Sequence, residues 1–150
     1  MSPAQDILWK YYEEELKQAI NHESSRSSIT NLILIITGVI ISIITYDGNI
    51  NYGDSFLAIF LMIIGLYGCI CNAKYYERFH FHYSRSKGYR RLLEEQYPNI
   101  DFNASRASSD IDNINRFKII SRIRLNWLWI ILNLMISLFG LVLTIKIFYN

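Results

Sequence analysis

The chain has 150 residues, which is enough for one domain. Hydrophobic residues make up 51% of it, and the mean hydropathy is +0.14. This average hides a segregation, since the apolar residues fall into three blocks and the charged residues lie almost entirely outside them. This segregation excludes an ordinary soluble domain, in which apolar and polar residues alternate with helix or strand period. The net charge of +2 indicates no class of partner, and Cys69 and Cys71 lie too close together for a disulfide framework.

Residues 2–23 predict an amphipathic helix. Ser2 suits the N-cap, Pro3 the first helical position, and Gln5 completes a capping box. One apolar stripe follows with helical period: Leu8, Tyr12, Leu16, Ala19 and Ile20. Three consecutive acidic residues at 13–15 disfavour an anionic lipid surface. We therefore expect this helix to pack on the basic segment that follows the second apolar block.

The three apolar blocks predict membrane spans at 27–46, 55–73 and 125–146. The first two blocks and residues 125–145 carry no charged side chain. A helix needs about 20 residues to cross a hydrocarbon layer of about 30 Å, and each block has that length. Helices that are apolar on every face have nothing to present to water, which argues against a soluble bundle. The sequence therefore predicts an all-α membrane protein with three transmembrane helices, in a single membrane domain over 1–150.

Basic residues are distributed unevenly around these spans. The connection 47–54 has two acids and no base, whereas the connection 74–124 holds 11 of the 15 Lys and Arg residues. The positive-inside rule then places the N-terminus and the 74–124 connection in the cytoplasm. With three spans, the C-terminus lies outside.

Polar residues inside the spans are uncharged, whereas a pump or proton relay would need an ionisable group there. Candidates for pore-lining or interhelical contacts are Asn31, Thr37, Ser42, Asn133 and Ser137. Small residues also recur four apart, at Gly38 with Ser42 and at Gly65 with Cys69. This spacing allows helices to approach closely, within one chain or between chains.

The segment after the second span is rich in Arg, His and Tyr, and no strong breaker interrupts it before Pro98. We expect one helix to leave the membrane and continue to about Tyr97. Candidate residues for binding an anion or a nucleotide share or extend one face of it: Arg78, His82, Arg85, Tyr89, Arg90 and Arg91. In the alternative reading, these bases set the topology and contact lipid phosphates.

Residues 99–109 predict a flexible loop within the 74–124 segment, and Ser109 with Asp112 predicts a capping box that starts a further helix. His80 and His82 do not predict a metal site, because residues two apart point to different sides of a helix. Phosphate loops, zinc motifs and nucleophile elbows are absent from the sequence. We therefore expect no enzyme activity, cofactor or metal.

Four short motifs stand out over residues 8–97: Trp9-Lys10-Tyr11-Tyr12, Tyr76-Glu77-Arg78-Phe79-His80-Phe81-His82, Tyr89-Arg90-Arg91-Leu92-Leu93 and Tyr97-Pro98. With them the segment resembles the RipA-type octameric membrane proteins of bacteria and, more loosely, the SLATT-type two-span effector domains. The resemblance implies a homo-oligomer in the bacterial inner membrane. The SLATT type further implies an effector of nucleotide-signalling antiphage systems. The third span departs from the two-span pattern.

The leading hypothesis is an oligomeric membrane effector that forms a pore, or disrupts the membrane, when a cytoplasmic signal acts on the basic helix. Three helices enclose no channel, so a pore would require several copies. Its partners would be other copies of the chain, membrane lipid and a nucleotide or oligonucleotide signal. The alternative is a non-conducting scaffold that binds a partner protein through residues 2–23. A third reading is a holin-like or antitoxin-like accessory under the control of a soluble partner.

Overall fold

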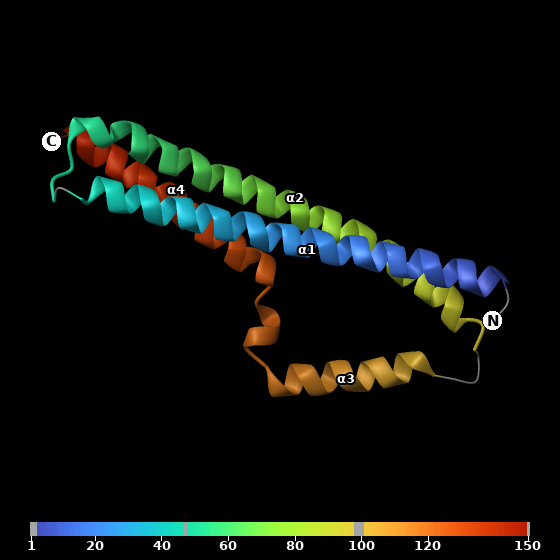
Figure 1. The fold of residues 1–150 in the computed structure, drawn as a ribbon. Helices are drawn as coiled ribbons and strands as arrows, with labels where there is room; N and C mark the ends of the chain where they lie inside the picture. Colours follow the sequence, from blue (N-terminus) through green and yellow to red (C-terminus); the bar gives the residue numbers. More distant parts are fainter. Residues whose placement is uncertain (1–2, 47, 98–100, 150) are drawn as a thin grey trace. The chain divides into compact units, whose positions relative to one another are not determined.

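A computed structural model describes residues 3–46, 48–97 and 101–149. Four α-helices make up most of it: α1 (Pro3–Ile44), α2 (Ser55–Glu94), α3 (Phe102–Arg116) and α4 (Leu125–Tyr149) (Figure 1). Two short 3-10 helices, Tyr52–Asp54 and Ile120–Arg122, precede α2 and α4. The described residues form no strand, which confirms the all-α class. The predicted cap Ser2 and the stop at Pro98 lie outside the described residues.

Three of the helices, α1, α2 and α4, are long and apolar enough to cross a membrane. α2 and α4 contain their predicted spans and begin at the predicted residues, Ser55 and Leu125. α1 covers the first predicted span up to Ile44, two residues before its predicted end at Tyr46. α2 then runs without a break to Glu94, which confirms that the second span continues as a helix through the basic segment. This chain is therefore a membrane protein with three transmembrane helices.

α1 joins two segments that the sequence pattern separates, the amphipathic helix predicted at 2–23 and the span predicted at 27–46. It is one helix of 42 residues. The Ser-rich stretch between the segments does not end the helix, because its hydroxyls bond within it. Ser28 Oγ donates to the carbonyl of Ser24 at 3.0 Å, and Thr30 Oγ1 donates to the carbonyl of Arg26 at 3.1 Å.

The predicted loop at 99–109 is wrong for the residues that the structure describes as helical, since α3 begins at Phe102. The N-cap is Asp101, whose side chain accepts a hydrogen bond from the backbone N–H of Ala104 at 2.8 Å. Ala104, Arg106 and Ala107 are good helix formers and extend the first turns. The helix start predicted at Ser109 therefore lies inside α3.

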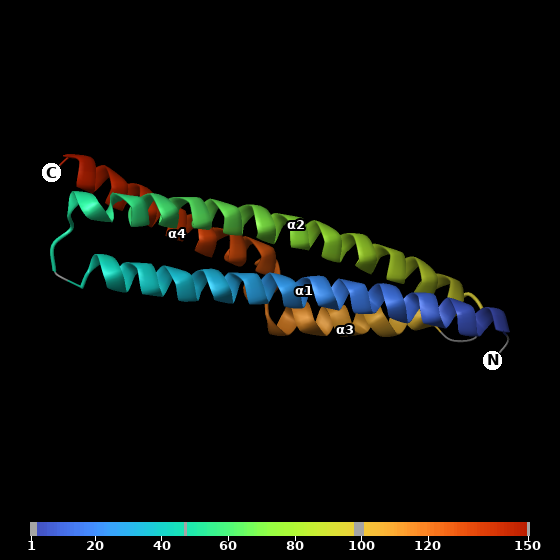
Figure 2. The ribbon, with the colours of Figure 1, turned by 45° about the horizontal axis from the view of Figure 1, so that its top comes forward.

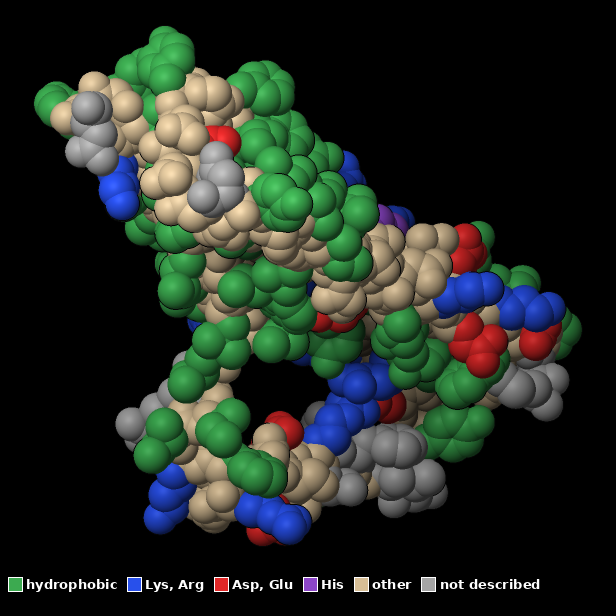
Figure 3. Space-filling view, turned by 60° about the vertical axis from the view of Figure 1, so that its left-hand side comes forward, with side chains coloured by type: hydrophobic (Ala, Val, Ile, Leu, Met, Phe, Trp, Pro, Cys, Tyr) green, Lys and Arg blue, Asp and Glu red, His purple; other side chains and the backbone are tan. Residues whose placement is uncertain are grey.

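The chain divides into two compact units. The polar unit comprises Met1–His22 and Glu77–Leu125, and the apolar unit comprises Glu23–Tyr76 and Asn126–Asn150. Within each unit, parts of α1 and α2 run side by side in opposite directions (Figures 1 and 2). The space-filling view shows large hydrophobic areas of surface, whereas Lys, Arg, Asp and Glu side chains gather in clusters (Figure 3).

The apolar unit packs α1, α2 and α4 around a small hydrophobic core. Its buried members are Ile33, Ile40, Ile44, Ala58, Leu61, Ile136, Leu143 and Ile147. Glycines bring α2 and α4 into backbone contact. A Cβ on Gly65 would lie 2.5 Å from the backbone nitrogen of Ser137, and one on Gly140 would lie 2.5 Å from that of Met62. Of the two small-residue pairs in the sequence, the one that begins at Gly65 therefore packs within the chain.

Candidate functional site

The interior of the apolar unit contains a hydrogen-bonded polar pair between α1 and α2. Thr30 and Asn72 are both completely buried. Asn72 Nδ2 donates to Thr30 Oγ1 at 3.2 Å and to the carbonyl of Gly68 at 2.9 Å. Polar side chains that bond between helices favour one pairing of helix faces, because sliding the helices would break the bond between them. Sequence reasoning missed this pair.

Arg26 is a buried charge in the apolar unit, with only 3% of its surface exposed. Its guanidinium forms an ion pair with Glu23, lies 5.9 Å from the ring centroid of Tyr76, and has NH1 3.4 Å from Asn126 Oδ1. These contacts come from all three helices of the unit. Arg26 thus joins α1, α2 and α4 where the first span begins, a role that its sequence position alone does not indicate.

Three of the five polar candidates for pore-lining or interhelical contacts are buried inside the apolar unit: Thr37, Asn133 and Ser137. Asn133 Nδ2 donates to the carbonyl of Trp129 at 2.8 Å, while its Oδ1 has no hydrogen-bond partner among the described residues. These three side chains face the interior of a bundle made by one chain. Thr37 Oγ1 also has no hydrogen-bond partner among the described residues, so burial is what these three residues share.

The other two candidates, Asn31 and Ser42, are exposed on α1. Together with Gly38 they lie within roughly 40° of one another around the helix, at 3.6 residues per turn. Ser42 Oγ donates to the carbonyl of Gly38 at 2.8 Å. The described part of the chain supplies no hydrogen bond to the side chain of Asn31.

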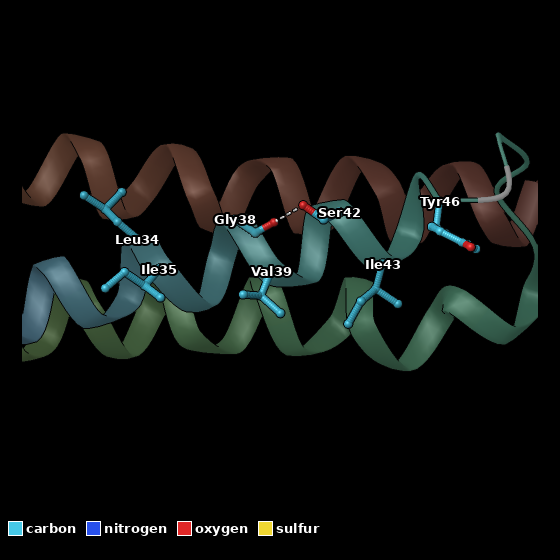
Figure 4. A pocket seen from close by; sticks show the side chains of 7 residues that line it. All are labelled: Leu34, Ile35, Gly38, Val39, Ser42, Ile43 and Tyr46. Atoms are coloured by element: carbon cyan, nitrogen blue, oxygen red, sulfur yellow. Dashed lines mark hydrogen bonds between the residues drawn. The ribbon is translucent and has the colours of Figure 1, made fainter.

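An open groove of about 710 Å³ runs along this face of α1. All of its lining residues belong to α1 except Tyr46, which lies two residues beyond the end of the helix. Figure 4 shows their side chains along one side of the helix: Leu34, Ile35, Gly38, Val39, Ser42, Ile43 and Tyr46. A Cβ on Gly38 would meet no atom within 4 Å, so this glycine is not packed within the chain. These seven residues, together with Asn31, make up the outer face of α1.

In the polar unit, Glu15 joins the first part of α1 to the basic face of α2. Its side chain is 12% exposed, with Oε2 2.7 Å from His82 Nδ1 and Oε1 3.1 Å from Arg85 NH1. One turn or more away, the rings of Tyr11 and Tyr89 stack with centroids 5.6 Å apart. The predicted packing of the N-terminal helix on the basic segment is therefore present. It occupies His82, Arg85 and Tyr89, three of the six ligand candidates.

A stacked pair of imidazoles extends the same contact, with the ring centroids of His22 and His82 5.2 Å apart. Burial first, and then the nearby charges of His82 and Arg78, lower the pKa of His22 below its ordinary value of 6.5. Between that lowered pKa and 6.5 the unfolded segment binds more protons than the folded one. The stability of the polar unit therefore decreases as the pH falls through this range.

We expect this loss to appear in hydrogen exchange of the α1 amides near His22. Between about pH 7.5 and pH 5.5, the protection of these amides should fall further in the wild type than in His22→Phe, which keeps a stacked ring without a titrating group. Equal losses in the two proteins would contradict the assignment to His22.

The remaining basic candidates lie at the far end of α2. Arg90 and Arg91 line a cavity of about 400 Å³ together with Lys87, Glu94 and, from α3, Arg106. Glu94 accepts contacts from Arg106 and, at 3.4 Å, from Arg90 Nε. Arg78 lies elsewhere, 3.9 Å from Glu77 and 5.9 Å from the ring of Phe81. The structure thus places two of the six predicted ligand residues in a common cavity.

A second cavity of about 400 Å³ adjoins the first and shares Arg90, Glu94 and Arg106 with it. Its other walls are Trp9 and Tyr12 from α1 and Leu93 and Tyr97 at the end of α2. Sequence reasoning missed Trp9, Tyr12, Lys87 and Arg106, because they come from three helices and acquire a common site through the fold. The described residues contain no group of side chains that could hold a metal ion.

No protein-family model, curated protein or solved structure matches this chain.

Proposed function

We propose that several copies of this chain assemble into a gated pore in a bacterial inner membrane, with the N-terminus in the cytoplasm and the C-terminus outside. The observation that carries the proposal is the exposed, unbonded Asn31. It lies about five residues, or about 8 Å, from the middle of a span whose hydrocarbon half-thickness is about 15 Å. Lipid tails cannot satisfy its amide, whereas another copy or a water-filled channel can.

The outer face of α1 suits either of those surroundings. Gly38 flattens the middle of the face, so that a second helix can approach it closely. Asn31 and Ser42 supply uncharged polar groups at two depths, which can line a narrow aqueous path between rings of Ile and Leu. Thr37, Asn133 and Ser137 are buried inside each three-helix bundle and do not line the path in this arrangement.

The polar unit would receive the signal. Arg90 and Arg91 lie on α2, the helix that also supplies the second span, so a ligand that moves this part of α2 can act on the span directly. The resemblance to SLATT-type effectors supports a nucleotide or oligonucleotide as the signal and antiphage defence as the setting. A membrane scaffold that conducts no ions is the competing function.

Ion flux from liposomes that contain the purified protein tests the pore. Leak should arise with wild-type protein, alone or on addition of nucleotides or short single-stranded oligonucleotides. Asn31→Leu should lower it at least about tenfold, because it removes the polar group that only a partner or water satisfies. Leu32→Ile is the matched control, an apolar exchange at the next position of α1 that leaves Asn31 in place, and it should retain the leak.

Liposomes that remain tight with wild-type protein under all of these conditions would contradict the pore and favour the scaffold. Expression toxicity gives the same distinction in cells. An unrestrained pore should halt growth and Asn31→Leu should relieve the effect, whereas a scaffold should be harmless in both forms.

A further inference from the structure

The cations around the end of α2 exceed the anions that neutralise them. Lys87, Arg90, Arg91 and Arg106 line the first cavity, and the carboxylates in contact with them are Glu94 and Glu95, the latter 3.3 Å from Arg91 Nε. Four positive and two negative groups leave a net charge of +2. A phosphate monoester carries about −1.5 to −2 at neutral pH, which matches this excess.

Arginines dominate the cluster, and their geometry favours phosphate. A guanidinium presents several N–H donors in a planar fork that fits two phosphate oxygens at once. Arg90 and Arg106 approach the same carboxylate, Glu94, from α2 and α3. Two guanidinium groups that already converge on one carboxylate are oriented to bind a phosphate group together. Lys87 adds a further positive charge in the same cavity.

The adjoining cavity provides a different surface. Trp9 and Tyr12 lie on α1 with ring centroids 5.4 Å apart, and Tyr97 and Leu93 complete the wall. Aromatic walls of this kind stack on flat rings, and base stacking is a major contribution to nucleotide binding. Because Arg90 and Arg106 belong to both cavities, a ligand with a phosphate in the first can place a ring in the adjoining second.

We propose that the two cavities form one binding site for a soluble phosphorylated ligand that carries a planar ring, the class to which nucleotides belong. Phosphate is also present in lipid headgroups, but a glycerophosphate has no ring to occupy the Trp9 cavity. The site rests on the proposed function and deepens it by giving the signal a location. It differs from the face of Arg78, His82, Arg85 and Tyr89, most of which contacts α1.

Equilibrium dialysis of radiolabelled ATP against full-length protein in phosphatidylcholine nanodiscs tests the site. Saturable binding is expected, with Arg90→Gln and Arg106→Gln each raising the dissociation constant at least about tenfold. Arg116→Gln is the matched control, because it makes the same change about 15 Å further along α3. It should leave the constant unchanged, and circular dichroism of all variants checks that they fold.

Competition experiments separate the ring from the phosphate. Glycerol 3-phosphate, which represents a lipid headgroup, and inorganic phosphate should each compete at least about tenfold more weakly than AMP, which carries the same single phosphate group and adds the ring. Trp9→Ala should weaken ATP several-fold and leave inorganic phosphate unaffected. Absence of saturable ATP binding would overturn the site, and so would Arg90→Gln and Arg106→Gln proteins that bind ATP as tightly as the wild type. If glycerol 3-phosphate competes as strongly as AMP, the Trp9 cavity does not bind a ring. The arginines would then be assigned to lipid headgroups.

These binding measurements do not depend on conduction. Tight liposomes with intact ATP binding would contradict the pore and leave the site standing. If Arg106→Gln no longer binds ATP but still shows the leak of the wild type, the pore would stand. The site would then have no part in controlling it.

Discussion

Replacing Gly65 by alanine is expected to separate α2 from α4 and to lower the free energy of unfolding by about 1–3 kcal/mol. The added Cβ would lie 2.5 Å from the backbone nitrogen of Ser137 and 2.8 Å from the carbonyl oxygen of Asn133. Both are backbone atoms, which cannot move aside as the end of a flexible side chain can. The helices themselves must therefore shift, and the core around Ile136 loses contacts with them.

Unfolding by sodium dodecyl sulfate in mild detergent measures this loss, with the fluorescence of Trp127 and Trp129 on α4 as the signal. Gly88→Ala is the matched control on the same helix, because a Cβ there meets no atom within 4 Å. Alanine is the better helix former, so this variant should be as stable as the wild type or more stable by up to about 1 kcal/mol. A Gly65→Ala protein that unfolds with the wild type would contradict the close α2–α4 contact.

Glu15→Ala should release the first part of α1 from α2 within the polar unit. The substitution removes the carboxylate that accepts contacts from His82 at 2.7 Å and Arg85 at 3.1 Å, and it leaves both donors without this partner. Hydrogen bonds to charged groups contribute about 1.5–3 kcal/mol. A loss near 2 kcal/mol corresponds to roughly thirtyfold faster hydrogen exchange of the α1 amides around Glu15.

Glu14→Ala is the control, because Glu14 is exposed and carries the same charge one position earlier on α1. Its amide exchange should stay within a few-fold of the wild type. Comparable acceleration in the two variants would show that the effect follows net charge and would refute the specific role of Glu15.

The spans were predictable from the sequence because hydrocarbon imposes a simple rule. About 20 uncharged residues in a row suffice to identify each of them, whatever they contact. The continuity of α1 between residues 23 and 27 and the loop expected before α3 depended on weaker local signals. Ser28 and Thr30 can end a helix or bond inside it, and Asp101 can lie in a loop or cap a helix. In each case the local hydrogen bonds decided the outcome.

The candidate site was predictable in kind and not in position. Arginine, histidine and tyrosine at helical spacing identified the basic side of α2, and the acidic residues of α1 indicated what would cover it. Which basic residues of α2 are left uncovered by α1 depends on the register of the two helices. Contacts of Glu15 and the stacking of Tyr11 on Tyr89 set this register. A single sequence carries no signal for that register, so Trp9 and Arg106 had no reason to be grouped.

The long connection between α2 and α4 also has a consequence for biosynthesis. A ribosome adds about 5–20 residues per second, so the 74–124 segment delays the third span by about 3–10 s after the second. During that interval the surfaces of Gly65 and Gly68 that α4 will cover face lipid. The α1–α2 hairpin must hold its register without α4, and the buried bond between Asn72 and Thr30 joins the two helices that emerge first. The register of α1 on α2 can therefore be held by a bond between these two helices before α4 is synthesised.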